Sequence, residues 1–294
     1  DGEDRHPGAG PAPPDGQDIW GVQYRQIEYA TGVYSEPVSH PLARFTSVDE
    51  IEANYRWPSP DWWDYSGIAK QVEAASDRPI RGGGSEPFLQ YCVLRGLEQA
   101  MMDLIECPDI VEYSLGRLFD HCYQMTMRIY EQAAGKVMIT YVAEDMGSQE
   151  SLLFSPAQIK RFLLPGMKRM IDLAHQAGAF VFHHSDGAIR PIIPTMIEAG
   201  IDVLNPIQWR CAGMDREGLK RDFGHQLVFH GGVDNQYTLA RGTVDEVRRE
   251  VEENIGILGA GGGYILAPCH NIQAVSPPEN IVAMYETGYM LGCG

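Results

Sequence analysis

Short runs with strand character alternate with longer amphipathic runs from about residue 78 to the end of the chain. The short runs lie at 78–81, 136–141, 179–183, 202–205, 226–230 and 263–267. The longer runs have helical periodicity and lie at 87–105, 109–134, 156–177, 189–199, 214–222, 243–257 and 277–291. A strand that is regularly followed by a helix is typical of a parallel sheet whose strands are joined by crossover helices.

Six strands in one series favour a single (β/α)8 TIM barrel over a doubly wound sheet, so we predict an α/β fold class. Because a complete barrel has eight strands, we expect a further strand upstream of Asp1. The barrel is expected to span residues 78–294. Residues 1–77 are rich in aromatic residues and interrupted by prolines, with two short strands predicted around Val22–Tyr29. We interpret this segment as an N-terminal arm and lid, and stacking of its aromatic rings on a flat ligand is the alternative.

Local signals mark several ends of these elements. Thr243 and Ser276 are each followed three residues later by Glu, which is the capping-box pattern of a helix start. Gly135 and Gly178 fall between a helix and a strand, where a left-handed residue often ends a helix. The glycine runs 82–84 and 261–263 fit neither the dinucleotide nor the P-loop pattern, so we expect them to be turns.

Composition excludes several function classes. The chain has 294 residues, with 23 Lys+Arg against 40 Asp+Glu and a formal net charge of −17. Such a charge disfavours binding to nucleic acid or to an anionic membrane surface. No run approaches the length of a spanning helix, and Asp1–Arg5 has no apolar signal-peptide core. The six cysteines include no C-x-x-C pair, so we expect a reduced, cytoplasmic protein.

Polar and titratable residues follow five of the predicted strands. Barrel active sites lie at the carboxyl ends of the strands, so these residues are expected to meet at one mouth. They are Tyr141, Glu144 and Asp145; His184 and Asp186; Asn205 and Gln208; Asp234 and Gln236; and Cys269, His270 and Gln273. A lone Asp after a strand is more often a helix cap than a catalyst, so the individual signals are weak.

Four of these residues are candidate metal ligands, with Glu144 as a further candidate. They are His184, Asp186, Cys269 and His270. Zinc accepts imidazole nitrogen, thiolate sulfur and carboxylate oxygen, and a catalytic zinc keeps one position open. The residues come from separate strands, however, and no short spacing pattern identifies a metal site.

Three segments of the second half carry a family resemblance. Phe182–Gly187, Gly231–Gln236 and His270–Asn280 resemble the uroporphyrinogen decarboxylase superfamily, and the similarity extends from about Asp18 to the last helix. This superfamily includes the decarboxylase of tetrapyrrole synthesis and the corrinoid- and coenzyme M-dependent methyltransferases. The resemblance implies a (β/α)8 barrel, in agreement with the alternation of strands and helices.

The decarboxylase branch would act without a cofactor. Tyr141 and His270 fall where that branch has its Tyr and its C-terminal His, and Asp234 or Glu144 would stabilise a protonated pyrrole. Its arginine-rich R-Q-A-G-R motif, which grips the acidic side chains of the substrate, has no match here. The acidic net charge also disfavours a polyanionic substrate.

In the methyltransferase branch, a His-x-Cys motif and a later Cys bind zinc. His184-Ser185-Asp186 matches the first motif with Asp in place of Cys, and either Cys269 or His270 stands near the later position. An oxygen- and nitrogen-rich site is harder than a thiolate-rich one, and it suits polarising an ether or amine better than activating a thiol.

We therefore favour a methyltransferase-like enzyme in which zinc acts as a Lewis acid on a small methylated substrate. The methyl group would pass to or from a corrinoid carried by a partner protein, with Glu144 or Asp145 as general acid. Tyr141 and Asp234 are further candidate catalytic residues. A homodimer is a candidate assembly. Candidate substrate-binding residues are Asn205, Gln208, Gln236 and Gln273. The alternatives are uroporphyrinogen decarboxylase and a catalytically inactive barrel used for binding.

Overall fold

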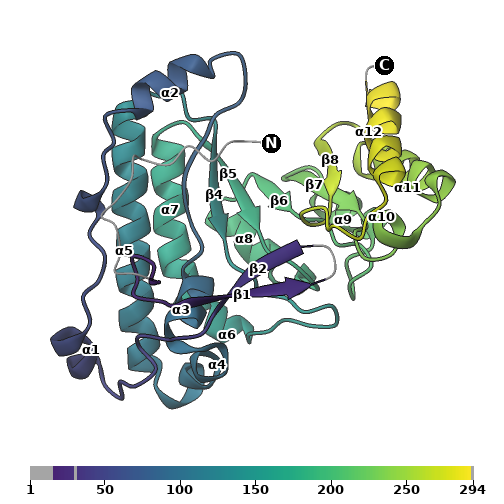
Figure 1. The fold of residues 1–294 in the computed structure, drawn as a ribbon. Helices are drawn as coiled ribbons and strands as arrows, with labels where there is room; N and C mark the ends of the chain where they lie inside the picture. The colour runs from purple at the N-terminus through teal and green to yellow at the C-terminus, as the bar shows by residue number, and fades with distance from the viewer. Residues whose placement is uncertain (1–15, 30–31, 293–294) are drawn as a thin grey trace. The chain divides into compact units, whose positions relative to one another are not determined.

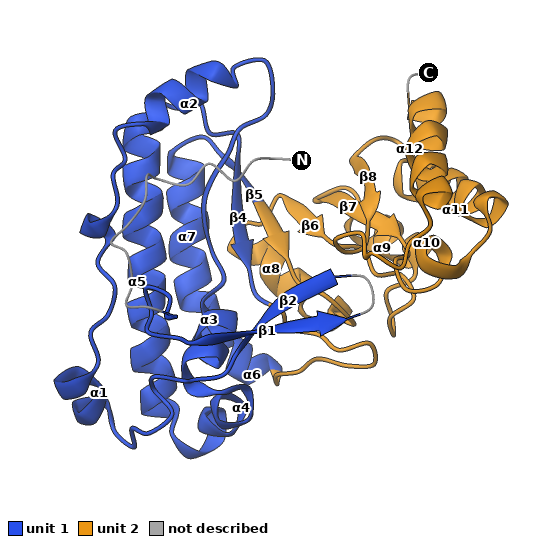
Figure 2. Cartoon of the chain, viewed as in Figure 1, with its two compact units in different colours: residues 1–144, 156–181 blue, residues 145–155, 182–294 orange. Residues whose placement is uncertain are grey.

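The computed structural model describes residues 16–29 and 32–292, and its chain forms two compact units (Figure 2). Unit 1 comprises residues 1–144 and 156–181, and unit 2 comprises residues 145–155 and 182–294. We describe each unit by itself. The division does not fall at residue 77, and the predicted boundary between an arm and a barrel stays a prediction.

Six parallel strands follow one another in chain order (Figure 1). They are β3 (Arg81–Ser85), β4 (Ile139–Ala143), β5 (Phe180–His184), β6 (Val203–Asn205), β7 (Val228–Val233) and β8 (Tyr264–Pro268). Each overlaps one predicted run, although β3 shares only Arg81 with its run, and the predicted α/β class with a parallel sheet is confirmed. Within the described residues the order begins at β3 and ends at β8, and the predicted eight-stranded barrel is not seen there.

The glycine run 82–84 lies inside β3, so its prediction as a turn was wrong. Gly83 and Gly84 have φ values of +69° and +143°. A Cβ atom on Gly83 would meet the Thr126 side chain at 2.4 Å, and one on Gly84 would meet the Tyr141 carbonyl oxygen at 2.4 Å. Glycine is therefore required here because neighbouring elements approach the strand closely, and strand propensity alone gives no sign of this. The run 261–263 does form a turn, as predicted.

Unit 1 packs helices against β3 and β4 and adds an antiparallel hairpin of β1 (Tyr24–Tyr29) and β2 (Gly32–Pro37). The long helix α5 (Pro108–Ala133) lies beside α7 (Leu164–Gln176), as Figure 1 shows. The other helices of this unit are α1 (Val48–Asn54), η1 (Pro60–Trp62), α2 (Ile68–Ala74), α3 (Pro87–Arg95), α4 (Leu97–Glu106), α6 (Pro156–Gln158) and η2 (Ile159–Leu163). Gly135 and Gly178 have φ values of +74° and +78°, which confirms them as left-handed residues between helix and strand.

A buried ion pair holds the N-terminal part of unit 1 to its helices. The Arg95 side chain on α3 donates from Nε to the Asp103 carboxylate on α4 at 2.6 Å, and both side chains are almost inaccessible to solvent. The same guanidinium donates from Nη1 to the backbone carbonyls of Leu42 and Phe45 at 2.6 and 2.7 Å. Arg95 therefore fixes the chain that precedes α1.

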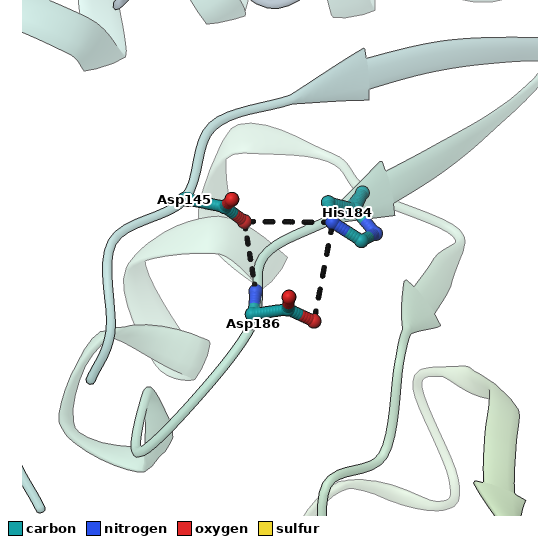
Figure 3. Close-up of side chains that lie close together, drawn as sticks. All are labelled: Asp145, His184 and Asp186. Atoms are coloured by element: carbon teal, nitrogen blue, oxygen red, sulfur yellow. Dashed lines mark hydrogen bonds and ion pairs between the residues drawn. The ribbon is translucent and has the colours of Figure 1, made fainter. Parts of the chain in front are cut away.

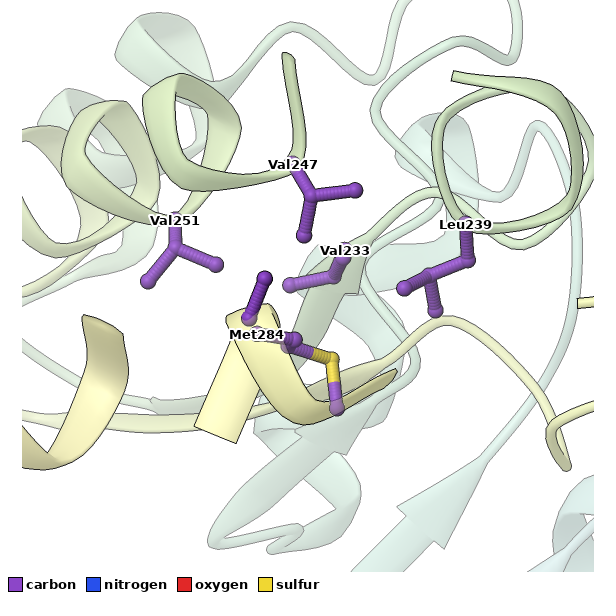
Figure 4. Close-up of a cluster of buried hydrophobic side chains, with 6 residues drawn as sticks. Val233, Leu239, Val247, Val251 and Met284 are labelled. Carbon is purple, nitrogen blue, oxygen red and sulfur yellow. The ribbon is translucent and has the colours of Figure 1, made fainter. Parts of the chain in front are cut away.

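Unit 2 contains a small apolar core between β7 and two helices, α11 (Val244–Leu258) and α12 (Pro278–Gly292), shown in Figure 4. Its buried residues are Val233, Leu239, Val247, Val251, Ala283 and Met284. The remaining helices of the unit are η3 (Arg190–Ile192), α8 (Ile193–Ala199), α9 (Arg216–Phe223) and α10 (Thr238–Arg241). The predicted capping box at Thr243 is formed. The one at Ser276 is not, because its buried hydroxyl has no hydrogen-bond partner in the described part of the chain.

None of the helices in the described ranges combines the length and the apolar composition that crossing a bilayer requires.

Candidate metal centre

Three side chains of unit 2 converge at the carboxyl end of β5 (Figure 3). His184 is the last residue of this strand, Asp186 follows it, and Asp145 comes from the loop after β4. The Nε2 atom of His184 lies 3.4 Å from an Asp145 carboxylate oxygen and 4.0 Å from Oδ1 of Asp186. One ligand atom from each residue lies within 4.8 Å of the other two, which is close enough for all three to bind one ion.

Backbone contacts hold the two loops that carry these residues together. The backbone N–H of Asp186 donates to Asp145 Oδ1 at 3.1 Å, and the N–H of Met146 donates to the Ser185 hydroxyl at 3.0 Å. A Cβ atom on Gly147 would meet the Asp186 carbonyl oxygen at 2.7 Å. A Cβ atom on Gly187, whose φ is +92°, would meet the Ser148 carbonyl oxygen at 2.4 Å. The two glycines therefore permit the approach that brings Asp145 to His184.

A chain of hydrogen-bonding side chains lies behind His184. Its Nδ1 atom is 2.7 Å from Oδ1 of Asn205, and Nδ2 of the same asparagine is 2.7 Å from Nδ1 of His230. Burial and, to a smaller extent, the nearby His184 lower the pKa of His230 to about 4. His230 is therefore neutral at physiological pH, as an acceptor for the asparagine N–H must be.

The donor set fits a divalent cation. Oδ1 of Asp186 is buried and has no hydrogen-bond partner among the described residues. Burial raises the pKa of Asp186; the neighbouring Asp145 also raises it, whereas His184 and His270 lower it. A buried acceptor without a donor is unfavourable unless a cation or proton occupies the space in front of it. Two carboxylates and one imidazole are ligands that zinc and harder divalent ions accept, and they leave coordination positions open.

Of the three cluster residues, Asp186 lines a cavity of about 620 Å³ within unit 2. Its polar lining combines amide side chains with charged or titratable ones. The amides are Gln149, Gln208, Asn235, Gln236 and Gln273, and the others include Asp186, Arg210, Asp234, Arg241 and His270. Asn235 donates from Nδ2 to the carbonyls of His270 and Asn271, so its buried Oδ1 is an acceptor, with no hydrogen-bond partner among the described residues. Three of the four predicted substrate-binding residues line this cavity, and the fourth, Asn205, lies behind His184 instead.

Cys269 and His270 line the same cavity but are outside the three-residue cluster. The Cys269 thiol donates to the Ile207 carbonyl at 3.1 Å, and burial raises its pKa above the usual range. His270 is exposed, and its Nδ1 lies 3.5 Å from the Asn271 carbonyl oxygen. The structure thus brings together His184 and Asp186 from the predicted ligands and adds Asp145, which we had expected to be an acid.

The Asp234 carboxylate is held by backbone hydrogen bonds and by an ion pair. Its carboxylate accepts from the backbone N–H groups of Tyr237 and Thr238 at 2.9 and 3.0 Å. Arg210 forms an ion pair with it at 3.0 Å and reaches Glu250 at 3.7 Å. The side chain therefore holds the turn before α10, and its predicted catalytic role stays a prediction.

Tyr141 and Glu144 belong to unit 1. Glu144 is buried and accepts from the backbone N–H of Phe88 at 3.1 and 3.2 Å. The Arg81 guanidinium lies 4.4 Å from the centre of the Tyr141 ring. The sequence did not single out His230 or Asn235 as site residues. His230 ends a predicted strand and Asn235 follows the same strand, but the direction of a side chain at a strand end depends on the register of the sheet.

A family profile described as uroporphyrinogen decarboxylase (URO-D) matches residues 39–289 of the chain. The chain is a member of the uroporphyrinogen decarboxylase family. This membership confirms the resemblance inferred from the three sequence segments.

Curated relatives in the family are distant. A uroporphyrinogen decarboxylase from Geotalea daltonii is 28% identical over 141 residues, which are 47% of this chain and 39% of that protein. Another, from Shewanella pealeana, is 22% identical over 271 residues, 84% of this chain and 70% of that protein. The chain thus matches less than half the length of the first relative. Among solved structures, a methyltransferase from Methanosarcina mazei superposes with a TM-score of 0.67 at 18% identity, covering 93% of this chain and 76% of that one. At this identity the likeness concerns the fold alone.

Proposed function

We propose that this chain is a metal-dependent, methyltransferase-like enzyme of the uroporphyrinogen decarboxylase family. The observation that carries the proposal is the cluster of Asp145, His184 and Asp186 with a buried, unpartnered carboxylate oxygen at the edge of a cavity. We further propose that the parallel sheet is part of a (β/α)8 barrel, as family membership implies.

Asp145, His184 and Asp186 would hold the ion, for which zinc is the first candidate. A bound zinc ion would supply Lewis acidity toward the oxygen or nitrogen that carries the methyl group of a small substrate. The amide side chains of the cavity would orient this substrate by donating and accepting hydrogen bonds. A corrinoid on a partner protein would be the methyl acceptor or donor.

The position of the cluster supports the methyltransferase branch. His184-Ser185-Asp186 occupies the place of the His-x-Cys motif that the resemblance assigns to zinc in this branch. Since the thiolate is replaced by a carboxylate and Cys269 is buried on a backbone carbonyl, all donors of the cluster are oxygen or nitrogen. Such a site favours polarising a methyl ether or methylamine over activating a thiol.

The names of the sequence relatives favour uroporphyrinogen decarboxylase as the second candidate. That reaction would require cationic groups for a polyacidic substrate. The cavity of unit 2 contains Arg210 and Arg241, and the charge of Arg210 is compensated by Asp234 and Glu250. The candidate metal cluster would have no role in a cofactor-free decarboxylation.

Metal content and two activity assays test the proposal. We expect about one divalent ion per wild-type chain by plasma mass spectrometry after zinc loading and dialysis, and loss of this ion in His184→Ala and Asp186→Ala. Asp245→Ala removes a carboxylate that is 85% exposed on α11 and serves as the matched control. Methyl transfer from methylamines and methoxylated aromatics to free cob(I)alamin should require the ion. Protein without stoichiometric metal would overturn the proposal, and conversion of uroporphyrinogen to coproporphyrinogen would establish the second candidate instead.

A further inference from the structure

Asn205 and His230 link two strands of unit 2 behind the candidate metal centre. Asn205 is the last residue of β6, and His230 lies in β7 next to it. The amide group of Asn205 lies 2.7 Å from each of the two histidine Nδ1 atoms, with its oxygen toward His184 and its nitrogen toward His230. The His230 ring packs edge-on against Phe182, with ring centres 4.9 Å apart. Ring packing and hydrogen bonding thus fix the side-chain rotamers of His184, Asn205 and His230.

The orientation of the Asn205 amide in the structure assigns a tautomer to His184. An amide oxygen only accepts, so Nδ1 of His184 must carry a hydrogen to donate to it. In the neutral ring the lone pair then lies on Nε2, which is the nitrogen next to Asp145 and Asp186. If the amide were turned over, its N–H would face Nδ1 and the neutral ring would carry its hydrogen on Nε2. A hydrogen at Nε2 is incompatible with metal binding through that atom.

The second histidine is compatible with the first of these two amide orientations, which is the one in the structure. The amide nitrogen of Asn205 needs an acceptor, and Nδ1 of a neutral His230 is one. With the amide turned over, its oxygen would face Nδ1 of His230, and the two lone pairs would repel unless His230 changed its tautomer. The tautomers of His184 and His230 are therefore coupled through the amide group of Asn205.

We propose that Asn205 and His230 are positioning residues that hold His184 in its Nδ1-protonated tautomer, so that Nε2 is presented to a divalent cation between Asp145 and Asp186. This inference rests on the proposed metal function. Outer partners of a ligand histidine commonly contribute 10- to 100-fold to metal affinity by fixing ring orientation and tautomer.

Zinc affinity of four variants tests the inference, measured by competition with a chromogenic chelator. We expect Asn205→Leu to weaken Zn²⁺ binding about 10- to 100-fold, because His184 loses its Nδ1 acceptor. Asn205→Asp keeps an acceptor for the same N–H, so its affinity should equal or exceed that of the wild type. His230→Phe removes the acceptor that orients the amide, and its affinity should lie between those of Asn205→Leu and the wild type.

Asn280→Leu is the matched control. Asn280 is a buried asparagine of unit 2 that donates to the carbonyls of Leu239 and Gly242, away from the cluster. This substitution should lower the thermal unfolding temperature while leaving Zn²⁺ affinity unchanged. Asn205→Leu binding within twofold of the wild type, or Asn205→Asp binding as weakly as Asn205→Leu, would overturn the inference.

A second readout does not depend on metal. In metal-free protein labelled with ¹⁵N-histidine, the Nδ1 atom of His184, assigned with a His184→Gln variant, should show the shift and couplings of a protonated ring nitrogen. Asn205→Leu should lose this signature. An unprotonated Nδ1 in the wild type would overturn the inference. A wild type that keeps a protonated Nδ1 yet binds no Zn²⁺ would support the tautomer assignment and overturn the proposed metal function, so the two failures are distinguishable.

Discussion

Replacing Asp103 by Asn removes the counter-charge of Arg95 inside unit 1. The carboxylate of Asp103 accepts from Arg95 Nε and the Tyr91 hydroxyl, each at 2.6 Å, and from Gln99 Nε2 at 2.8 Å. The side chain of Asp103 is fully inaccessible and that of Arg95 is 4% exposed. In Asp103→Asn the Arg95 guanidinium stays buried with no opposite charge. The nitrogen of the new amide is itself a donor and would face the donor groups that surround the present carboxylate.

Breaking a buried ion pair by removing one partner costs about 3–5 kcal/mol, because the remaining charge is uncompensated. We therefore expect the free energy of unfolding to fall by about 3–5 kcal/mol in Asp103→Asn. Urea titration followed by tryptophan fluorescence suits this measurement, because Trp20, Trp57, Trp62 and Trp63 belong to unit 1 and only Trp209 belongs to unit 2.

Glu36→Gln provides the control. It breaks an ion pair of the same unit, between Glu36, whose side chain is 45% exposed, and Arg25, whose side chain is 65% exposed. The loss of unfolding free energy should therefore be at most about 1 kcal/mol. If Asp103→Asn were no more destabilising than Glu36→Gln, the reasoning from burial would be refuted.

The ion pair of Arg95 and Asp103 also predicts that the free energy of unfolding depends on pH. Burial opposes ionisation of Asp103, but the hydrogen bonds from Arg95, Tyr91 and Gln99 outweigh it and lower the pKa of this carboxyl in the folded state. A lowered folded-state pKa contributes stability that is present above the pKa of the unfolded state and is lost as the pH falls through the folded pKa. The difference in unfolding free energy between wild type and Asp103→Asn should therefore shrink in strongly acidic buffer.

Three further predictions concern unit 2. Met284→Ala should lower its free energy of unfolding by about 2–5 kcal/mol in urea titration, because the side chain is fully buried in the apolar core and leaves a cavity; a loss below about 1 kcal/mol would contradict this packing. Thr243→Ala should cost about 1 kcal/mol by removing the capping box of α11, and Thr243→Ser should restore most of it. Cys269 should react with iodoacetamide far more slowly than the half-buried Cys107, as followed by peptide mass spectrometry, because burial raises the pKa of its thiol.

The periodic part of the chain was predictable because each strand and helix carries its own pattern. Five of the six strands and the long helices of the second half lie close to the runs that the alternation predicted, whereas β3 shares only Arg81 with its run. Gly82–Gly84 was misread, because the requirement for glycine arises from the close approach of Thr126 and Tyr141, which are distant in sequence. Closure of the sheet was likewise inferred from strand number and not from any local pattern.

The candidate site was predictable only as a set of residues at strand ends. Their chemistry depends on which side chains the register directs toward one another. His184 and Asp186 meet Asp145 because Gly147 and Gly187 allow two loops to touch. Cys269, an equally good ligand by residue type, is instead directed to the Ile207 carbonyl. Neither outcome follows from spacing along the chain.

The division of the chain into units limits how this protein can be dissected. The polypeptide passes from one unit to the other after Glu144, Ser155 and Val181. No single cut can therefore yield each unit as one continuous fragment. A fragment that began at Phe182 would retain His184, Asp186 and most of the cavity wall but would lack Asp145. Limited proteolysis within residues 145–155 would separate Asp145 from the two other members of the cluster along the chain. We therefore expect nicking to weaken binding of the proposed ion before the rest of unit 2 unfolds.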